Sequence, residues 1–259
     1  MLVLEAQNVK KYYNGKLIIE FDGLKVFSGD KIGIVGQNGS GKTTLLNILS
    51  KAIEPDEGFV KQYCDITYIR QFSDEEINAE PKVLSEFDLS SKVHQNAFSG
   101  GEKTRIKIAN ALNDNNILLL ADEPTSNLDY KGIELLKQKF FKVETILLIS
   151  HDRVLLDTIC NKIIEIKDGK LKTYSGNYSF YKEKQQLEME RMQFEYLQYI
   201  DEKERLEKVY LDKKKLASGI AHKPNNRGNQ CLDSPSARSK GSQERNVQRA
   251  AKAVITRLK

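Results

Sequence analysis

Apolar positions along the first 175 residues follow two repeats, one typical of strands and one typical of helices. Short apolar runs predict strands at 17–21, 31–35, 66–69, 117–121, 145–149, 162–166 and 170–174, and helical periodicity predicts helices at 44–51, 103–112, 133–141 and 154–160. The runs at 117–121 and 145–149 are almost entirely apolar, which indicates strands buried on both faces. Asp168 and Gly169 predict a tight hairpin. This mixture predicts an α/β fold with a parallel core sheet and antiparallel edge strands.

Beyond residue 175 the pattern becomes that of one long helix. Residues 178–217 contain no Gly or Pro and are rich in Glu, Lys, Gln and Leu. Alternating steps of three and four residues mark a coiled-coil seam: Met189, Met192, Tyr196, Tyr199, Lys203, Leu206 and Tyr210. Residues 218–245 predict a flexible polar loop, and the helical period returns after it. We therefore predict two domains, 1–175 and a helical hairpin at 176–259, whose return helix is cut short as in a fragment of a longer protein.

Composition excludes two classes of protein. The longest purely aliphatic run is 117–121, whereas a membrane-spanning helix needs roughly 20 apolar residues, so no membrane insertion is expected. The three cysteines, Cys64, Cys160 and Cys231, stand far apart, which excludes a disulfide scaffold. The N-terminus lacks the basic start and the apolar core of a signal peptide. These features predict a cytoplasmic protein.

The net charge of +5 hides an asymmetry along the chain. Residues 208–259 hold 13 Lys and Arg against 3 Asp and Glu, while the rest of the chain is mildly acidic. The basic tail is either a solvated terminus or an arm that binds a polyanion.

A phosphate-binding loop is the first candidate for chemistry. The sequence fits GxxxxGK[ST] between the strand 31–35 and the helix that starts near residue 44. Its backbone N–H groups and the helix N-terminus suit phosphate oxygens. Lys42 would reach the β- and γ-phosphates, and the Thr43 hydroxyl would ligate Mg²⁺. The expected nucleotide-binding residues are Gly36, Gln37, Asn38, Gly39, Ser40, Gly41, Lys42, Thr43 and Thr44.

Two adjacent carboxylates end the apolar strand at 117–121. Asp122 is suited to hold Mg²⁺ through water, and Glu123 is suited to polarise the attacking water as a general base. An acidic pair often merely caps a strand. Its position downstream of the phosphate loop favours the catalytic interpretation.

Further motifs complete a resemblance to the ATP-binding cassette family, which covers about 175 residues. Phe98-Ser99-Gly100-Gly101-Glu102 stands where the family has Leu-Ser-Gly-Gly-Gln, and Pro124-Thr-Ser-Asn-Leu-Asp129 follows the carboxylates. The resemblance implies ATP hydrolysis with Glu123 and His151 as catalytic residues, Gln71 as a further Mg²⁺ ligand and Asp129 in the D-loop. It also implies an aromatic residue stacked on adenine, for which Tyr13 fits and the neighbouring Tyr12 remains an alternative.

The same resemblance implies a composite site. Ser99, Gly100 and Gly101 would contact the γ-phosphate of ATP bound to another cassette. The chain would therefore need a second cassette, supplied by self-association or by a longer protein. The isolated chain is expected to be a weak ATPase.

Within the family the chain is similar to the ABC-F proteins, which carry two cassettes joined by a charged helical hairpin and act on ribosomes. The interval 72–98 is too short for the large helical subdomain of a transporter cassette. The resemblance implies antibiotic resistance through displacement of drugs from the large ribosomal subunit, with the linker near rRNA and tRNA. Basic residues near the hairpin tip suit RNA phosphates: Lys213, Lys214, Lys215, Lys223 and Arg227. The alternatives are the cytosolic ATPase subunit of a drug-efflux transporter and an inactive, truncated ATP-binding fragment.

Overall fold

A computed structural model describes residues 1–71, 85, 99–113 and 117–221. The chain divides into two units, Met1–Lys184 and Gln185–Lys259. The boundary lies after Lys184 rather than at the predicted residue 175. The reason is that Tyr178 and Tyr181, at the start of the long helix, pack against the core of the first unit.

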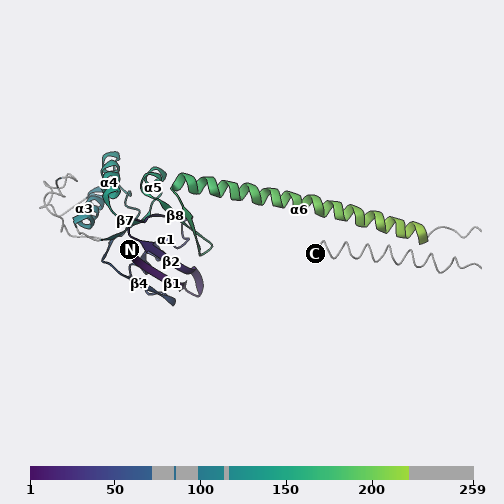
Figure 1. The fold of residues 1–259 in the computed structure, drawn as a ribbon. Coiled ribbons are helices and arrows are strands. Elements are labelled where there is room, and N and C mark those ends of the chain that lie inside the picture. The colour runs from purple at the N-terminus through teal and green to yellow at the C-terminus, as the bar shows by residue number, and fades with distance from the viewer. Residues whose placement is uncertain (72–84, 86–98, 114–116, 222–259) are drawn as a thin grey trace, which may run out of the picture. The chain divides into compact units, whose positions relative to one another are not determined.

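A single mixed sheet forms the centre of the first unit (Figure 1). Within the described residues its order is β4-β1-β2-β9-β8-β3-β7-β6-β5. Strands β8, β3, β7, β6 and β5 run parallel to one another, whereas β4-β1-β2 and β8-β9 are antiparallel pairs. The strands are β1 (Leu2–Tyr13), β2 (Lys16–Phe27), β3 (Lys31–Gly36), β4 (Glu57–Gln62), β5 (Ile66–Ile69), β6 (Leu118–Asp122), β7 (Thr145–Ile149), β8 (Lys162–Lys167) and β9 (Lys170–Ser175). The predicted fold class is confirmed, although β1 and β4 were not predicted from the sequence.

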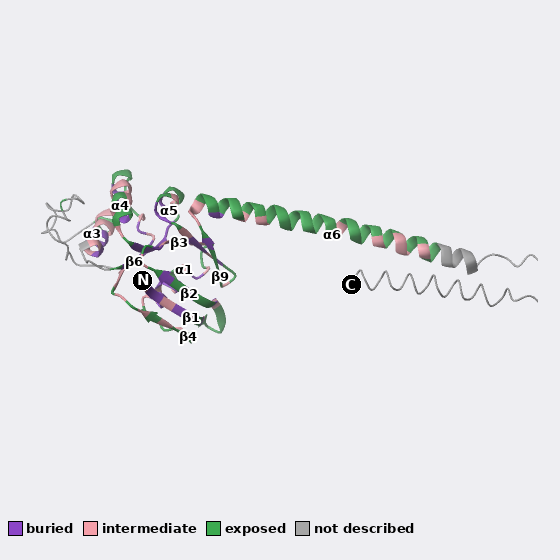
Figure 2. Cartoon of the chain, viewed as in Figure 1, coloured by how far each residue is buried: buried purple, intermediate pink, exposed green. Residues whose placement is uncertain are grey.

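Two hydrophobic clusters cover the two faces of the parallel strands. Helices α3 (Gly100–Asn113), α4 (Tyr130–Lys142) and α5 (Arg153–Ile159) contribute to one cluster, and α1 (Lys42–Leu49) contributes to the other. Successive residues of β6 alternate between the clusters, with Leu119 in the first and Leu120 in the second. Both β6 and β7 are buried along their whole length, as predicted (Figure 2). Ile117, in contrast, lies before β6 and is 39% exposed.

The long helix α6 (Tyr178–Ala221) joins the two units. Tyr181 is buried, and its hydroxyl donates to Glu165 of β8 at 2.9 Å. The Tyr174 and Tyr181 rings meet edge to face, with centroids 5.0 Å apart. These contacts fix the start of α6 on the first unit.

The second unit is described only for residues 185–221, where α6 continues without a break. Its predicted seam residues Met189, Met192, Tyr196 and Tyr199 are each more than half exposed. The loop predicted from residue 218 is wrong at its start, because α6 continues to Ala221. A single Gly219 costs a helix only about 1 kcal/mol relative to Ala. The rest of the predicted tip, with Lys223 and Arg227, and the return helix lie outside the described residues.

No helix within the described ranges is both long and apolar enough to cross a bilayer.

Candidate functional site

The phosphate-loop motif occupies the turn between β3 and α1, as the sequence predicts. Gly41, which precedes α1, has a left-handed backbone with φ 101° and ψ 13°, a conformation that side chains disfavour. A Cβ atom on Gly36 would lie 2.6 Å from the carbonyl oxygen of Ile166 in β8. These two glycines therefore let the loop pass close to the sheet and turn sharply into the helix.

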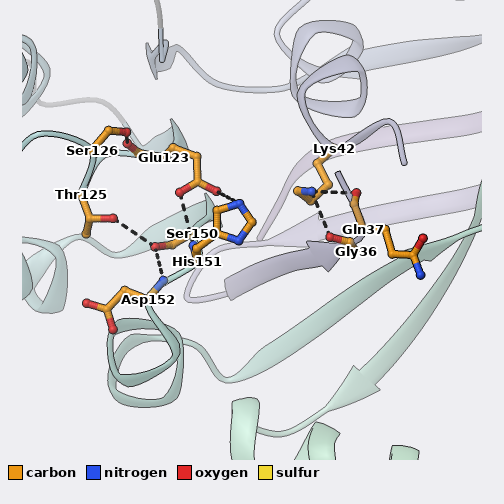
Figure 3. Close-up of polar contacts among 9 residues, drawn as sticks. All are labelled: Gly36, Gln37, Lys42, Glu123, Thr125, Ser126, Ser150, His151 and Asp152. Carbon is orange, nitrogen blue, oxygen red and sulfur yellow. Dashed lines mark hydrogen bonds and ion pairs between the residues drawn. The ribbon is translucent and has the colours of Figure 1, made fainter. Parts of the chain in front are cut away.

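Lys42 starts α1 and reaches back over the loop (Figure 3). Its ammonium donates to the carbonyl oxygens of Gly36 and Gln37, each at 3.0 Å. The side chain therefore places a positive charge beside the backbone N–H groups at the helix N-terminus, where anions are favoured.

Asp122, the last residue of β6, is a buried carboxylate that is 2% exposed. Neither of its oxygens has a hydrogen-bond partner among the residues that the structure describes. Burial raises the pKa of Asp122, while the nearby Thr43 hydroxyl and Lys42 ammonium lower it in part. A buried carboxylate with unused oxygens is costly unless a cation or a donor completes it.

Glu123 follows in a left-handed backbone conformation with φ 50°. Its backbone N–H donates to the Ile149 carbonyl at 3.0 Å, and its own carbonyl accepts from Ser126 at 3.1 Å. The carboxylate meets His151 twice, with Oε2 3.3 Å from the backbone nitrogen and Oε1 3.4 Å from Nε2 (Figure 3). Burial raises the pKa of Glu123, and His151 opposes the shift. The pair therefore holds a partly desolvated carboxylate in a fixed orientation.

His151 is positioned by the start of α5. Asp152 caps that helix by accepting from the N–H groups of Val154 and Leu155 at 2.9 and 3.0 Å. The Asp152 N–H donates to Ser150 Oγ, which lies 3.4 Å from Thr125 Oγ1 (Figure 3). The His151 side chain is 68% exposed, so it borders solvent at the rim of the site.

A pocket of about 470 Å³ brings most of these side chains together. That volume is in the range of small-molecule sites. Gly36, Gln37 and Ser40 lie in the loop beside it. Tyr13 borders the pocket, whereas the alternative Tyr12 is not among the described lining residues. The lining consists of Tyr13, Ile18, Asn38, Gly39, Gly41, Lys42, Thr43, Thr44, Gln71, Asp122, Glu123, Ile149 and His151.

Two lining residues, Ile18 and Ile149, were not predicted from the sequence. Ile18 approaches the phosphate loop, with its Cγ2 atom 3.3 Å from the place a Gly41 Cβ would take. Ile149 ends β7 beside the carboxylates. Both lie in predicted strands, but an apolar residue in a strand gives no sign of facing a pocket.

Ser99, Gly100 and Gly101 lie apart from this pocket, at the start of α3. Ser99 and Glu102 form a capping box, with Glu102 accepting from the Ser99 N–H at 2.8 Å. The helix start rests on the loop that contains Asp129, because a Cβ on Gly101 would lie 2.6 Å from the Asn127 carbonyl oxygen. Arg105 pairs with Asp129 at 2.6 Å. Asp129 therefore braces α3 and caps α4, where it accepts from the Gly132 N–H at 3.0 Å.

The donor set fits Mg²⁺. Asp122 offers two buried oxygens without partners in the described ranges, and Thr43 and Gln71, whose side chains carry a hydroxyl and an amide oxygen, line the same pocket. Mg²⁺ takes oxygen ligands and is commonly held by one or two carboxylates together with substrate phosphates.

Comparison with known proteins agrees with this geometry. The family model described as ABC transporter matches residues 22–126. The erythromycin resistance ATP-binding protein MsrA of Staphylococcus epidermidis is 34% identical over 183 residues, which is 67% of this chain. The chain belongs to the ATP-binding cassette family. Within the family it groups with the ABC-F proteins. The ribosome protection protein VmlR of Bacillus subtilis is 33% identical to it over 201 residues, which is 73% of this chain.

The chain also matches the energy-dependent translational throttle protein EttA of Haemophilus influenzae, at 31% identity over 70% of this chain. It spans little more than a third of these relatives, covering 37%, 36% and 38% of MsrA, VmlR and EttA. Cassettes of this family in general imply ATP with Mg²⁺.

Solved structures share the cassette fold. The ATP-binding subunit of an ABC transporter has a TM-score of 0.60 at 21% identity, and the match covers 67% of this chain and 90% of that one. The dimeric, post-hydrolysis cassette MJ0796 bound to ADP and Pi has a TM-score of 0.57 at 24% identity, over 66% of this chain and 98% of that one. At these identities the likeness supports the fold alone.

Proposed function

We propose that the cassette binds ATP with Mg²⁺ and hydrolyses it. The observation that carries this proposal is the pocket lined by the phosphate-loop lysine together with the buried carboxylate of Asp122 and the partly buried carboxylate of Glu123. Lys42 and the N–H groups at the start of α1 bind the phosphates. Thr43, Gln71 and Asp122 hold Mg²⁺, which neutralises phosphate charge when bound.

Glu123 is proposed as the general base. The two contacts from His151 orient its carboxylate, and burial makes it a better proton acceptor by raising its pKa. Tyr13 stacks on the adenine at the edge of the pocket, with Ile18 beside it.

A second cassette is proposed to complete the site. Ser99, Gly100 and Gly101 present N–H groups at a helix start, yet they lie apart from the pocket of their own chain. A second copy, or a second cassette of a longer protein, would place this helix start against the γ-phosphate.

Complementation between two inactive variants tests this arrangement. Ser99→Asp keeps a capping side chain but sets a negative charge against the γ-phosphate, so it is expected to bind ATP without turnover. Lys42→Ala lacks a working pocket but keeps an intact Ser99. An equimolar mixture should regain turnover that rises steeply with protein concentration, because mixed dimers contain one complete site. A mixture as inactive as either variant alone would exclude a site shared between two copies of this chain, and the second cassette would then have to come from a longer protein.

We propose that the protein acts on the ribosome, in antibiotic resistance by displacing drugs from the large subunit. Support comes from the names of the relatives, which include an erythromycin resistance protein and a ribosome protection protein. The described part of the tip places the Lys214 and Lys215 side chains on an exposed stretch of α6, with Lys213 half-buried. We propose that these lysines, with Lys223 and Arg227, contact rRNA or tRNA phosphates.

Changing Lys213, Lys214 and Lys215 together to Gln is expected to weaken ribosome binding and its salt dependence. The logarithmic salt slope should fall by about one unit per lost phosphate contact. Co-sedimentation with ribosomes at several salt concentrations measures both effects. The matched control changes three exposed cassette lysines, Lys131, Lys142 and Lys170, which removes the same net charge. An equal loss in the two triple variants would argue against a specific contact, and sedimentation with membranes instead of ribosomes would favour a transporter subunit.

A further inference from the structure

Lys107 is a buried lysine that the proposed chemistry does not use. It lies in α3, is only 7% exposed and is flanked by Ile106 and Ile108, which are 1% and 0% exposed. A buried ammonium is costly unless it is hydrogen-bonded. Its contacts should therefore have a structural or functional consequence.

The Lys107 ammonium donates to two successive backbone carbonyls. Nζ lies 3.2 Å from the oxygen of Arg70 and 3.2 Å from that of Gln71. Both residues come directly after β5, at the point where the chain leaves the sheet. Ile69, the last residue of β5, is itself buried at 2% exposure. Lys107 therefore holds the first two peptide groups after the strand.

Gln71 connects this contact to the proposed site, because it lines the pocket together with Asp122 and Thr43. Hydrogen bonds from a charged donor are stronger than neutral ones. Two of them on adjacent carbonyls restrict the backbone dihedrals that decide where the Gln71 side chain emerges. The helix that carries Lys107 also begins at Gly100, about 10 Å away along its axis.

We propose that Lys107 is a positioning residue that ties Gln71 to helix α3, and so links the nucleotide pocket to the helix start at Ser99–Gly101. This role rests on the proposed function, in which Gln71 holds Mg²⁺ in the nucleotide pocket. A displacement of α3 would move the Gln71 backbone through Lys107. In the opposite direction, a ligand that fixes Gln71 would stabilise one position of α3.

Hydrogen exchange of the chain without nucleotide tests the tie itself. Lys107→Met keeps the length and the apolar stem of the side chain but removes the donor. Amides in the segment 64–71 should exchange at least about tenfold faster, the ratio that corresponds to the loss of one hydrogen bond from a charged donor. Lys107→Arg should restore protection in part. Lys142→Met, which removes an exposed lysine from α4, should leave the segment unchanged.

A double-mutant cycle with Gln71→Ala tests the link to the pocket. The readout is the affinity for ATP with and without Mg²⁺. If Lys107 acts through Gln71, Lys107→Met should weaken Mg²⁺-dependent binding in the wild-type background and have no further effect in Gln71→Ala. A purely structural lysine would instead lower the melting temperature and give additive effects.

Each outcome bears on the proposal. Unchanged exchange at 64–71, or additive effects in the cycle, would overturn it. If the wild-type chain bound no ATP, the proposed function would fall, whereas the exchange data would still decide whether Lys107 anchors Gln71. Should Lys107→Met fail to fold, Lys107→Gln replaces it, because the shorter amide cannot span the same distance to both carbonyls.

Discussion

Replacing Glu123 with Gln is expected to slow ATP hydrolysis by about 10²–10⁴-fold, the contribution typical of a general base, while ATP stays bound. Gln has the same shape as Glu, and its amide oxygen can still accept from the His151 N–H that orients the carboxylate at 3.3 Å. What the variant lacks is a group that can take a proton from the attacking water. The left-handed backbone at Glu123, with φ 50°, is unaffected by a change confined to the side-chain terminus.

Single-turnover hydrolysis of radiolabelled ATP, measured together with ATP retention, separates the two effects. Glu183→Gln is the matched control, because it makes the same change at an exposed position on α6. The assignment of Glu123 would be wrong if the variant turned over ATP at the wild-type rate. Loss of ATP binding with the fold intact would instead indicate that the carboxylate holds the nucleotide rather than the water.

The centre of the parallel half of the sheet could be predicted because β6 and β7 are buried on both faces. A strand in that environment is a continuous apolar run, as at 117–121 and 145–149, and the run is visible whatever the neighbours are. The same runs end at Asp122 and before His151, so strand and site were found together.

Strand β1 escaped prediction because its alternation changes phase. Leu4 and Ala6 are buried, but the next fully buried residue is Val9 rather than residue 8. Asn8 has φ 49°, and the register with β4 shifts between Gln7 and Lys10. A bulge of this kind moves the following side chains to the other face, which erases the two-residue period. The partner strand β4 has no buried residue to reveal it.

Within the site, local motifs were recognisable and tertiary contacts were not. The phosphate loop and the carboxylate pair are each contained in a few consecutive residues, so spacing alone identifies them. Tyr13, rather than Tyr12, lines the pocket beside residues that are distant in sequence. The contact of Lys107 with Gln71 likewise joins two distant segments. Such contacts depend on how α3 and the strands pack, which no local pattern encodes.

Replacing Lys42 with Ala is expected to abolish ATP binding at micromolar nucleotide, with a loss of affinity of about a hundredfold or more. Lys42 supplies a charge at the N-terminus of α1 and holds the loop through the carbonyls of Gly36 and Gln37. When ATP is bound, each hydrogen bond from this ammonium to a phosphate oxygen would contribute about 1.5–3 kcal/mol, so losing one such bond to each of the β- and γ-phosphates accounts for the effect. Lys42→Arg should not restore binding, since a planar guanidinium does not reproduce a compact ammonium.

Fluorescence titration with a labelled ATP analogue, with and without Mg²⁺, measures this loss. Lys131→Ala is the matched control, because it removes an exposed lysine from α4. An unchanged melting temperature in Lys42→Ala would show that the loss lies in the pocket and not in the fold, because the side chain takes no part in either hydrophobic cluster. If Lys42→Ala bound ATP as tightly as the wild type, the phosphates would have to be held elsewhere. The Mg²⁺ site proposed at Thr43 and Asp122 would then no longer lie beside the phosphates, and that assignment would fall as well.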